Sequence, residues 1–511
     1  MSQHPRPASP NPRSLSFLAK IVGAEEPPAD VRAVEVRGVT LDSRQVRPGD
    51  LYAALAGERT HGAAFAKDAA AAGAVAIITD RLGRERSGAS GLPLLVVPDP
   101  RAVLGRIASD IYDRPSEDMT TLAVTGTNGK TTTAYLLESG LRAAGLRTGL
   151  LGTVETRIGD EALPSIRTTP EAPELHALLG VMVDRKVEAV AMEVSSHALA
   201  LHRVDGVQFT VALFTNLSHD HLDFHFSLES YFLAKAELFT AVRAKAAVVN
   251  LDDEYGRRLV AKPQIVTTTY SASGADAADW RATGAVPGPG GTEFTVLGPG
   301  GLKLAARVAL PGDFNVANAL GAIATLVTAG VDPEAAVRGV GECPGVPGRM
   351  ERIQQGQEFL AVVDYAHTPD AIATLLAALR PVTSGRIIAV VGAGGDRDKA
   401  KRPLMGEAAA AGAEIVVLTD DNPRSEDPAA IMAALRSGAL KASVAHGSEV
   451  IVQHDRALAI QYAVGRADAG DTVVVAGKGH EQGQEAKGAV RPFDDRAVLA
   501  EALRSAREAD A

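Results

Sequence analysis

The sequence predicts an α/β protein with three domains, of which the second and third are built on parallel sheets. Three observations support this fold class. The chain has 511 residues, and a domain usually takes roughly 100–200 residues. From about residue 117 onward, short apolar runs alternate with helical stretches, which is the order of a doubly wound parallel sheet. Aromatic residues make up only 4% of the chain. Ala, Val and Leu must therefore fill the cores, as helix-covered parallel sheets allow.

Composition and charge indicate a globular protein and argue against several other classes of protein. Apolar residues make up 46% and charged residues 22% of the chain, which is typical of a globular protein. The formal net charge of -10 argues against binding to nucleic acid, which needs clustered Lys and Arg. Cys343 is the single cysteine, so no intrachain disulfide can form, and a reducing compartment is the simplest interpretation. No apolar run reaches about 18 residues, so we expect no membrane span.

The first fourteen residues, MSQHPRPASPNPRS, contain four prolines and no apolar stretch. A signal peptide needs an apolar segment, so we do not expect one here. We expect residues 1–14 to form a disordered tail and the protein to be cytoplasmic.

Three regions are expected to follow the tail. Residues 15–116 form the first, which ends at the segment DRPS, where the proline disfavours helix in the residue before it. Residues 117–348 form the second and residues 349–511 the third. The strand candidates of the first region are Val34–Val39, Asp50–Leu55, Ala74–Thr79 and Leu94–Val97.

Both later regions show the β–α alternation. The strand candidates of the second region are Leu122–Thr125, Ala189–Val194, Thr210–Phe214 and Ala246–Asn250. Those of the third are Phe359–Val363, Arg386–Val391, Ile415–Thr419 and Thr472–Ala476. Near the end of the second region, EFTVLGPGGLKLAARVAL predicts a β-hairpin with a GPGG turn.

The strongest local motif is LAVTGTNGKTT, residues 122–132. Its glycines let backbone N–H groups converge on a phosphate, and the following helix N-terminus and Lys130 add positive charge. The Thr131 hydroxyl is placed to bind Mg²⁺. Val124 stands where the longer GxxxxGK[ST] motif has its first glycine, so this is the shorter GxxGKT form. The alternative is a chance Gly-rich turn, but the strand before it and the helix after it favour a P-loop and an ATPase-like central domain.

Two further segments offer metal ligands. Glu193 lies near the end of the apolar strand EAVAMEV, where a carboxylate faces the ligand crevice of a parallel sheet. A strand-end Glu in solvent is an equally good interpretation. The segment NLSHDHLDFH, residues 216–225, contains three histidines and two aspartates. It lacks the spacing of a structural zinc site. A single His or Asp that assists a magnesium-nucleotide is the better hypothesis.

Lys235 is the only charge on the apolar face of the predicted helix SLESYFLAKAELFTAV, residues 227–242. The other members of that face are Leu228, Tyr231, Phe232, Leu238, Phe239 and Val242. The ordinary alternative is a lysine that reaches outward to solvent. A buried lysine loses its proton more readily, and the neutral amine can react.

Three strands of the last region each lead into a polar loop. The loops begin at Gly392, Asp420 and Gly477, and in a parallel sheet they would converge on one edge. Together they supply two arginines, an asparagine and a glutamate. Arg binds carboxylates bidentately and Glu accepts from an ammonium, which suits a zwitterionic ligand. Each loop taken alone is equally consistent with ordinary turn chemistry.

The motifs in order resemble those of the Mur ligases, three-domain enzymes that build the peptide of cell-wall precursors. The matching segments are TLDSR, GTNGKTTT, TTPE, MEVSSHAL, NLSHDHLDFH, the Lys235 helix, GDFNVANAL, PGRME, DYAHTPD, GGDRDKAKRP, DNPR and GKGHE. The resemblance implies a first domain that binds a UDP-precursor, a central ATP-binding domain and a C-terminal Rossmann-like domain that binds an amino acid. DNPR points to the members that add meso-diaminopimelate to UDP-N-acetylmuramoyl-L-alanyl-D-glutamate, because their Arg, here Arg424, holds the distal carboxylate.

The resemblance also implies site residues. The UDP end of the precursor would contact Leu41, Ser43, Glu58, Arg59 and Thr60, and its muramoyl-dipeptide would contact Thr168, Thr169, Ser195 and Arg203. ATP would contact Gly126, Thr127, Asn128, Gly129, Lys130, Thr131, Thr132, Asn315, Arg349, Asp364 and His367. Diaminopimelate would contact Arg397, Asp421, Asn422, Pro423, Arg424, Gly477 and Glu481. Two Mg²⁺ would be held by Thr131, Glu193, His221 and Lys235, the last as a carbamate. The catalytic residues would be Lys130, Lys235 and His221.

The sequence departs from the family pattern at three places. The letters ERT at 58–60 replace an HQA-like run, so contacts there would be mostly through the backbone. Arg167 stands where Asn is frequent, and Leu201 stands where Gln is frequent. The resemblance assigns no role to these two residues.

The implied reaction is ATP-dependent amide ligation in peptidoglycan biosynthesis, through an acyl phosphate, by a monomer. Two other functions stay open. One is a lysine-adding or folylpolyglutamate synthase-like ligase, against which Arg424 and TLDSR argue respectively. The other is a P-loop kinase, or an ATP-binding module without ligation.

Overall fold

The computed structural model describes residues 5–8, 10–57, 60–288 and 291–510. These residues form two compact units. The first comprises the described residues of Met1–His219, together with His225–Tyr270 and Gly321–Gly339. The second comprises Asp220–Phe224, the described residues of Ser271–Leu320, and those of Val340–Ala511. The predicted domain boundaries at residues 116 and 348 remain predictions.

The first unit begins with a small parallel sheet in the order β3-β4-β5-β6. Its strands are β3 (Gly38–Thr40), β4 (Asp50–Ala54), β5 (Ala76–Thr79) and β6 (Leu94–Val96). Apolar side chains of α1 (Leu15–Val22) and α4 (Pro100–Ile111) bury one face of it. The expectation of one strand over Val34–Val39 is wrong. The chain forms β2 (Glu35–Val36) and β3, which pair with different partners, β1 (Arg13–Ser14) and β4.

The prediction of a disordered tail over residues 1–14 is wrong for the described part of that segment. Arg6 binds the carboxylate of Asp50 through Nη1 at 2.6 and 2.8 Å, and Asp50 is 2% exposed. Asn11 donates to Asp113 at 2.8 Å, and Arg13 donates to the carbonyl of Asp110. A rule based on composition counts apolar residues. It misses ion pairs with acidic groups that lie far along the chain.

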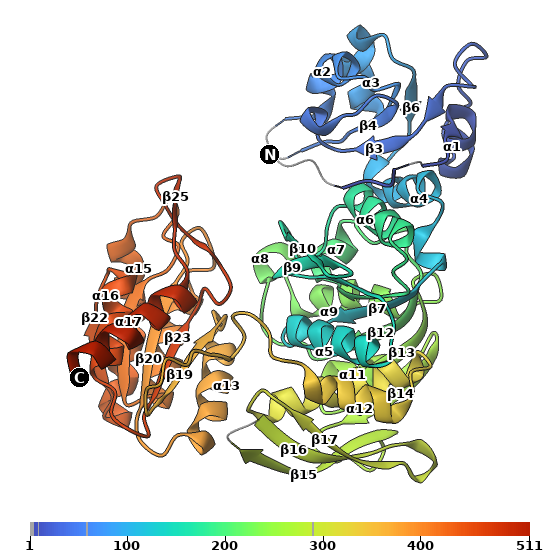
Figure 1. Ribbon diagram of the computed structural model, residues 1–511. Helices are drawn as coiled ribbons and strands as arrows, with labels where there is room; N and C mark the ends of the chain where they lie inside the picture. Colours follow the sequence, from blue (N-terminus) through green and yellow to red (C-terminus); the bar gives the residue numbers. More distant parts are fainter. Residues whose placement is uncertain (1–4, 9, 58–59, 289–290, 511) are drawn as a thin grey trace. The chain divides into compact units, whose positions relative to one another are not determined.

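The larger sheet of the first unit has the strand order β10-β9-β8-β11-β7-β12-β13-β14. From β8 to β14 all neighbours are parallel, and β9 and β10 extend the sheet as an antiparallel meander. Figure 1 shows this sheet in colours from blue-green to yellow-green, with helices packed on it. The strands are β7 (Thr120–Thr125), β8 (Thr148–Leu151), β9 (Glu155–Ile158), β10 (Glu161–Pro164), β11 (Ala189–Glu193), β12 (Phe209–Phe214), β13 (Ala244–Asn250) and β14 (Val266–Ser271). The helices between them are α5 (Lys130–Ala143), α6 (Ala172–Asp184), α7 (Ser196–Ala200), α8 (Leu222–His225), α9 (Leu228–Ala236) and α10 (Glu254–Ala261).

The second unit begins with the expected hairpin. Strands β15 (Trp280–Gly288), β16 (Gly291–Leu297) and β17 (Lys303–Val308) are antiparallel, and the GPGG turn joins the last two. Gly300 and Gly301 have φ of 69° and 81°, a left-handed conformation that glycine adopts without strain. Helices α11 (Asp313–Thr328) and α12 (Pro333–Glu342) follow in the chain, and their residues within Gly321–Gly339 belong to the first unit.

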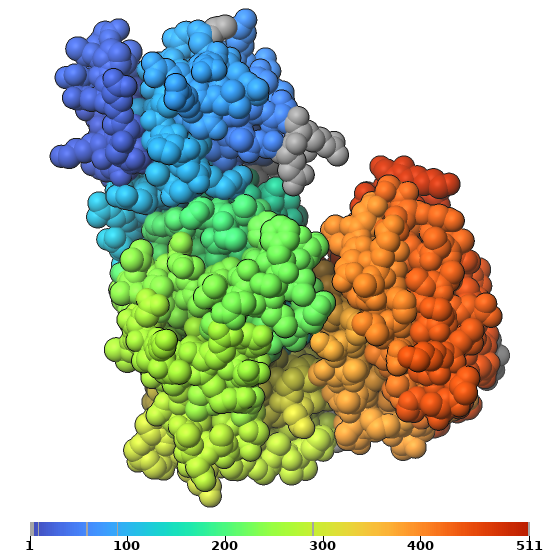
Figure 2. Space-filling model, turned by 180° about the vertical axis from the view of Figure 1, so that it is seen from behind, coloured from blue at the N-terminus to red at the C-terminus, as the bar shows by residue number. Residues whose placement is uncertain are grey.

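The C-terminal sheet has the order β18-β19-β23-β20-β21-β22 (Figure 1), and it is parallel except for β18. Its strands are β18 (Glu351–Arg352), β19 (Leu360–Asp364), β20 (Ile387–Ala393), β21 (Ile415–Asp420), β22 (Glu449–Val452) and β23 (Thr472–Ala476). Helices α16 (Arg456–Gly465) and α17 (Asp495–Asp510) bury one face, and α14 (Lys401–Gly412) and α15 (Pro428–His446) contact β20 and β21. Figure 2 shows this part of the chain, largely orange to red, as one closely packed body.

The fold class predicted from the sequence is confirmed: parallel sheets covered by helices dominate the chain. No described helix is long and apolar enough to cross a membrane.

Candidate active site

The glycine-rich turn lies between β7 and α5, at the centre of the larger sheet. Gly126 and Gly129 have φ of 154° and 85°, and a Cβ at Gly126 would collide with the hydroxyl of Thr215. Lys130 folds back over the turn and donates to the carbonyls of Gly126 at 3.0 Å and Thr127 at 2.8 Å. The N-cap residue of α5 is Gly129, which has no side chain to cap the helix N-terminus. This is the geometry of a P-loop, in which an anion binds to the helix N-terminus.

Glu193 is buried, at 1% exposed, and its carboxylate lies directly beside the P-loop. Its Oε2 accepts from the Thr131 hydroxyl at 3.0 Å and from the Thr153 hydroxyl at 3.1 Å. Its Oε1 accepts from the Thr153 backbone N–H at 2.7 Å. The alternative of a strand-end Glu in solvent is therefore wrong. A hydroxyl and a carboxylate are the hard oxygen donors that Mg²⁺ prefers, so the two side chains fit a magnesium-nucleotide.

The segment 216–225 does not form a metal cluster. Among the residues that the structure describes, no group of three or more His, Cys, Asp or Glu side chains is arranged to hold a metal ion. His225 is buried, and its Nε2 lies 3.0 Å from the hydroxyl of Ser196. His221 has a positive φ of 54°, and its Nε2 lies 3.4 Å from the Asp220 carboxylate. Its role as a magnesium ligand remains a prediction.

Lys235 is 1% exposed, so the alternative of a lysine that reaches solvent is wrong. Its Nζ donates to the carbonyl of Gly126 at 2.8 Å and lies 4.6 Å from the centre of the Tyr231 ring. The lysine helix thus contacts the P-loop directly. The predicted length of the helix is wrong, because α9 ends at Ala236, a 3₁₀ turn follows, and Val242 is 82% exposed. Val242 does not belong to the apolar face.

The four residues expected to hold the muramoyl-dipeptide lie together. Thr168 Oγ1 lies 3.0 Å from Thr153 Oγ1, and the hydroxyl of Thr169 donates to the carbonyl of Glu193 at 2.9 Å. The backbone N–H of Ser195 donates to Thr169 Oγ1 at 3.1 Å. Arg203 donates to the carbonyl of Thr169 at 3.5 Å, and burial lowers its pKa below the ordinary value. A continuous polar chain therefore runs from the P-loop through Glu193 to this group.

The residues expected at the UDP end are more scattered. Leu41 lines a small surface pocket between β3 and the start of α6, together with Arg6, Gln45 and Glu174. Ser43 opens a 3₁₀ turn after Leu41, and the carbonyl of Thr60 accepts from the N–H of Gly57 at 3.2 Å. Neither residue lines the pocket. Glu58 and Arg59 lie outside the described residues.

The second unit contains the other residues expected to bind ATP. The Arg349 guanidinium lies 4.2 Å from the centre of the Tyr365 ring, and Asp364 accepts from the N–H groups of Met350 and Ala366, each at 2.7 Å. Burial raises the pKa of the Asp364 carboxyl and lowers that of His367, whose Nδ1 lies 2.9 Å from the Tyr365 carbonyl.

Asn315 in α11 is 1% exposed and donates to the carbonyl of Pro311 at 2.8 Å.

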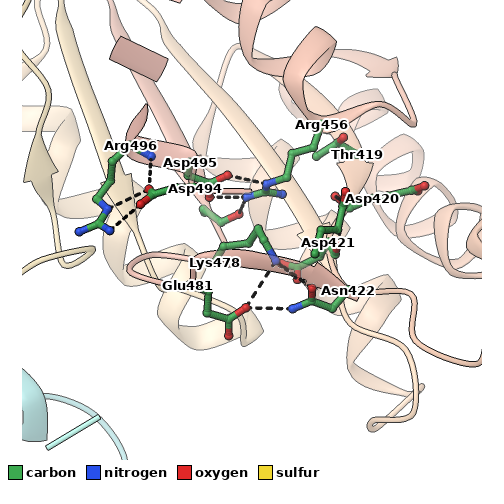
Figure 3. Close-up of polar contacts among 12 residues, drawn as sticks. Thr419, Asp420, Asp421, Asn422, Arg456, Lys478, Glu481, Asp494, Asp495 and Arg496 are labelled. Carbon is green, nitrogen blue, oxygen red and sulfur yellow. Dashed lines mark hydrogen bonds and ion pairs between the residues drawn. The ribbon is translucent and has the colours of Figure 1, made fainter. Parts of the chain in front are cut away.

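The three polar loops of the C-terminal sheet converge, as expected. Gly395 N–H donates to the Asn422 carbonyl at 2.8 Å, and Arg424 Nη1 donates to the Gly395 carbonyl at 2.7 Å. Asn422 Nδ2 in turn donates to Glu481 Oε2 at 2.9 Å (Figure 3). The loops after β20, β21 and β23 therefore form one site. Arg397, in the first loop, bonds only to the neighbouring carbonyl of Asp396 among the contacts described for it.

Sequence reasoning missed three residues of these sites. Thr153 follows the short strand β8 and makes two bonds to Glu193. Glu171 pairs with Arg203 at 2.9 Å. Lys478 is 0% exposed and bonds to Asn422 at 2.9 Å. The signal for Thr153 is a polar residue after a strand. The signal for Lys478 is a lysine between two glycines directly after a fully buried strand.

Family models match three consecutive parts of the chain: "Mur ligase family, catalytic domain" over residues 35–112, "Mur ligase middle domain" over 124–326, and "Mur ligase, glutamate ligase domain" over 348–479. A relative from Streptomyces coelicolor, named UDP-N-acetylmuramoyl-L-alanyl-D-glutamate–2,6-diaminopimelate ligase, is 56% identical over 500 residues, which is 98% of each chain. A solved structure of a ligase with the same name is 35% identical, with a TM-score of 0.67, over 97% of this chain and 100% of that one. A solved MurF ligase from Thermotoga maritima in complex with ADP shares the fold at 21% identity and a TM-score of 0.62, over 93% of this chain and 99% of that one. These matches, together with the P-loop and the converging loops, establish that the chain belongs to the Mur ligase family.

Proposed function

We propose that the protein is the ATP-dependent ligase that joins meso-diaminopimelate to UDP-N-acetylmuramoyl-L-alanyl-D-glutamate in peptidoglycan biosynthesis. The observation that carries this proposal is the polar chain from Thr131 through Glu193 to Thr169. It links a phosphate-binding turn to a group of donors suited to a carboxylate-bearing substrate. The names of the Streptomyces relative and of the solved ligase support the choice of substrates.

A carboxylate is a poor electrophile, because it is negative and has no good leaving group. In the proposed reaction, the γ-carboxylate oxygen of the D-Glu residue attacks the γ-phosphorus of ATP, and ADP leaves. The amine of diaminopimelate then attacks the carbonyl carbon, phosphate leaves and the amine loses a proton. Lys130 and the N–H groups of the P-loop offset the charge that develops on the phosphoryl oxygens. Closure of the C-terminal domain would exclude water, which hydrolyses the acyl phosphate.

Thr131 and Glu193 would hold a Mg²⁺ at the P-loop, and His221 would be a further ligand. When bound, the metal would polarise the phosphoryl oxygens. We propose that Lys235 serves as a carbamate: carbon dioxide adds to its neutral amine and a proton leaves. The result is a carboxylate-like ligand for a second Mg²⁺. Its burial against the Gly126 carbonyl and the Tyr231 ring places the amine beside the nucleotide turn.

The remaining site roles are proposals of the same kind. Arg349, Asp364, His367 and Asn315 would contact the nucleotide. The UDP end would lie near Leu41, Ser43 and residues 58–60. Arg424 and Arg397 would hold carboxylates of diaminopimelate, and Glu481 would accept from its ammonium. We assign the domains to residues 15–116, 117–348 and 349–511, and we propose a cytoplasmic monomer.

ADP release by the purified protein tests the proposal. We expect ADP only when ATP, Mg²⁺, UDP-precursor and diaminopimelate are all present, with a product heavier than the precursor by one diaminopimelate residue. Lysine in place of diaminopimelate should give little product. Faster ligation of lysine would identify a lysine-adding enzyme. ADP release that depends on neither the precursor nor the amino acid would leave only a P-loop ATPase. Light scattering of the purified protein gives its molar mass and so tests whether it is a monomer.

A further inference from the structure

Lys478 is a fully buried lysine that the proposed reaction does not yet use. It follows Gly477 at the end of β23, and its side chain is 0% exposed. A buried ammonium is costly unless oxygen atoms surround it. Three oxygens do so here (Figure 3). Nζ lies 2.9 Å from Asn422 Oδ1, 3.4 Å from Glu481 Oε2 and 3.7 Å from Asp421 Oδ1. An ammonium has three N–H donors, so each oxygen can face one of them.

These contacts fix the orientation of two side chains from different loops. Asn422 Oδ1 accepts from Lys478 and also from the backbone N–H of Glu485 at 2.9 Å. The amide therefore has its Nδ2 on the other side, where it donates to Glu481 Oε2. That same Oε2 accepts from Lys478. Glu481 is 34% exposed, and its second oxygen, Oε1, takes part in neither bond.

Two sets of charged side chains lie near Lys478, and they differ in how deeply they are buried. Asp421 and Glu481 bring two carboxylates close to one ammonium, and the side chain of Asp421 is 9% exposed. Arg456 and Asp495 form a more deeply buried pair, in which both side chains are 0% exposed, with Nε–Oδ1 and Nη2–Oδ2 distances of 2.7 Å. Arg456 also donates to the carbonyl of Ala476, the last residue of β23, at 3.0 Å. Arg456 is paired with Asp495 and also attracts Asp421 and Glu481 electrostatically, but it is Lys478 whose ammonium lies within 3.7 Å of both carboxylates.

We propose that Lys478 is a positioning residue of the amino-acid site, whose buried ammonium holds Glu481 and Asn422 in the orientation that receives the ammonium of diaminopimelate. This inference rests on the proposed function, because it takes Glu481 as a contact of the amino acid. Without the lysine, Asp421 and Glu481 repel each other and Glu481 loses one of the two donors on Oε2. The loss should appear in binding of the amino acid and leave the nucleotide untouched.

Lys478→Met tests this, because methionine keeps much of the side-chain volume and removes the charge. We expect the KM for diaminopimelate to rise at least about tenfold, because hydrogen bonds to charged groups are stronger than those between neutral groups. The KM for ATP should stay within about twofold, as expected when the change is local to another site. Lys441→Met is the matched control. Lys441 is 76% exposed on α15, and its Nζ is 3.6 Å from the Glu407 carboxylate. We expect its kinetics to equal those of the unchanged protein.

A second variant distinguishes the effect of the lysine charge from the effect of its packing, and it serves as the test if Lys478→Met does not fold. Lys478→Ala, purified and assayed with ethylammonium, should regain a lower KM for diaminopimelate, whereas ethanol of similar size should not restore it. Equal recovery with ethanol, or recovery with neither compound, would overturn the inference. An unchanged KM for diaminopimelate in folded Lys478→Met would also overturn it, as would equal rises in both KM values. If the unchanged protein fails to ligate diaminopimelate at all, the proposed function has failed instead.

Discussion

The hydroxyl of Thr131, in the first turn of α5, donates to Oε2 of Glu193 at the end of β11, with 3.0 Å between the two oxygens. The two strands that lead to these residues, β7 and β11, are neighbours in the sheet, with Val124 opposite Glu193. The pair is thus a direct product of the parallel topology. It places a carboxylate where a metal on the nucleotide phosphates would need one.

The substitution Glu193→Gln tests whether Glu193 binds Mg²⁺ or only accepts structural hydrogen bonds. The amide oxygen can still accept from Thr131, but the negative charge is lost. We expect the Mg²⁺ concentration for half-maximal activity to rise about 10–100-fold. The thermal midpoint should fall as well, because the amide nitrogen cannot accept from the Thr153 N–H as the second carboxylate oxygen does. The measurement is ADP release against Mg²⁺ concentration, with the exposed Glu85→Gln as control. An unchanged Mg²⁺ dependence would contradict the assignment.

Lys235→Ala should remove the proposed carbamate. We expect activity to fall at least about 100-fold, because a metal contributes several kcal/mol to charge stabilisation. Added acetate or formate should restore part of it by supplying the missing carboxylate. Lys245→Ala, which changes an exposed lysine in β13, should behave like the unchanged protein. Mass spectrometry of the intact protein under carbon dioxide gives a second measurement. Full activity of Lys235→Ala without any additive would end the carbamate hypothesis.

Arg424 should determine the choice of amino acid. Its guanidinium donates to the Gly395 carbonyl, and its Nε lies 3.5 Å from the Glu485 carboxylate, so the side chain is already oriented. Arg424→Ala should raise the KM for diaminopimelate about 10–100-fold, the loss expected for a charge-assisted pair. Arg424→Lys should not restore it, because lysine lacks the planar fork. Selectivity between diaminopimelate and lysine is the quantity to measure, and equal selectivity in all three proteins would refute the role.

Stability should fall in mild acid because of His176. This side chain is 0% exposed in α6, its Nε2 lies 2.9 Å from the Asp205 carbonyl, and burial lowers its pKa to about 4. The unfolded chain, with an ordinary value near 6.5, binds the proton first as pH falls. The contribution of neutral His176 to the free energy of unfolding is therefore complete above about pH 6.5 and is lost as the pH falls from there toward 4. Between pH 7 and pH 5, the free energy of unfolding should fall by roughly 2 kcal/mol.

Urea unfolding at pH 7 and pH 5 measures this effect. His176→Gln retains a donor toward the Asp205 carbonyl and removes the titration, so its free energy of unfolding should fall less between the two pH values. His446→Gln, which changes an exposed histidine at the end of α15, should keep the full decline. Identical declines in His176→Gln and the unchanged protein would show that other groups cause the loss.

The parallel strands and the P-loop were predictable because their signals are local. Buried strands such as Thr472–Ala476 consist almost entirely of apolar residues, and the turn before Lys130 has glycines at the positions that need positive φ. What the sequence did not reveal depends on partners that are distant in the chain. Thr153 acquires its role from Glu193, forty residues later. Lys478 acquires its role largely from Asn422, which lies 56 residues earlier in another loop.

The end of the Lys235 helix shows a second limit. The apolar spacing continues through Leu238 and Phe239, which are buried, so the pattern predicts one helix to Val242. The chain instead tightens into a 3₁₀ turn after Ala236 and leads into β13. The spacing of apolar residues identifies the buried face of a helix, but it does not show at which residue the helix ends.

The ion pair between Arg6 and Asp50 has a practical consequence for handling the protein. Expression plasmids are often trimmed to remove proline-rich leaders, and here such trimming would delete the partner of a carboxylate that is only 2% exposed. Asp50 would keep the Arg47 N–H at 2.8 Å but lose its countercharge inside the first sheet. Affinity handles therefore belong after residue 510, and shortened versions should retain the segment from residue 5 onward.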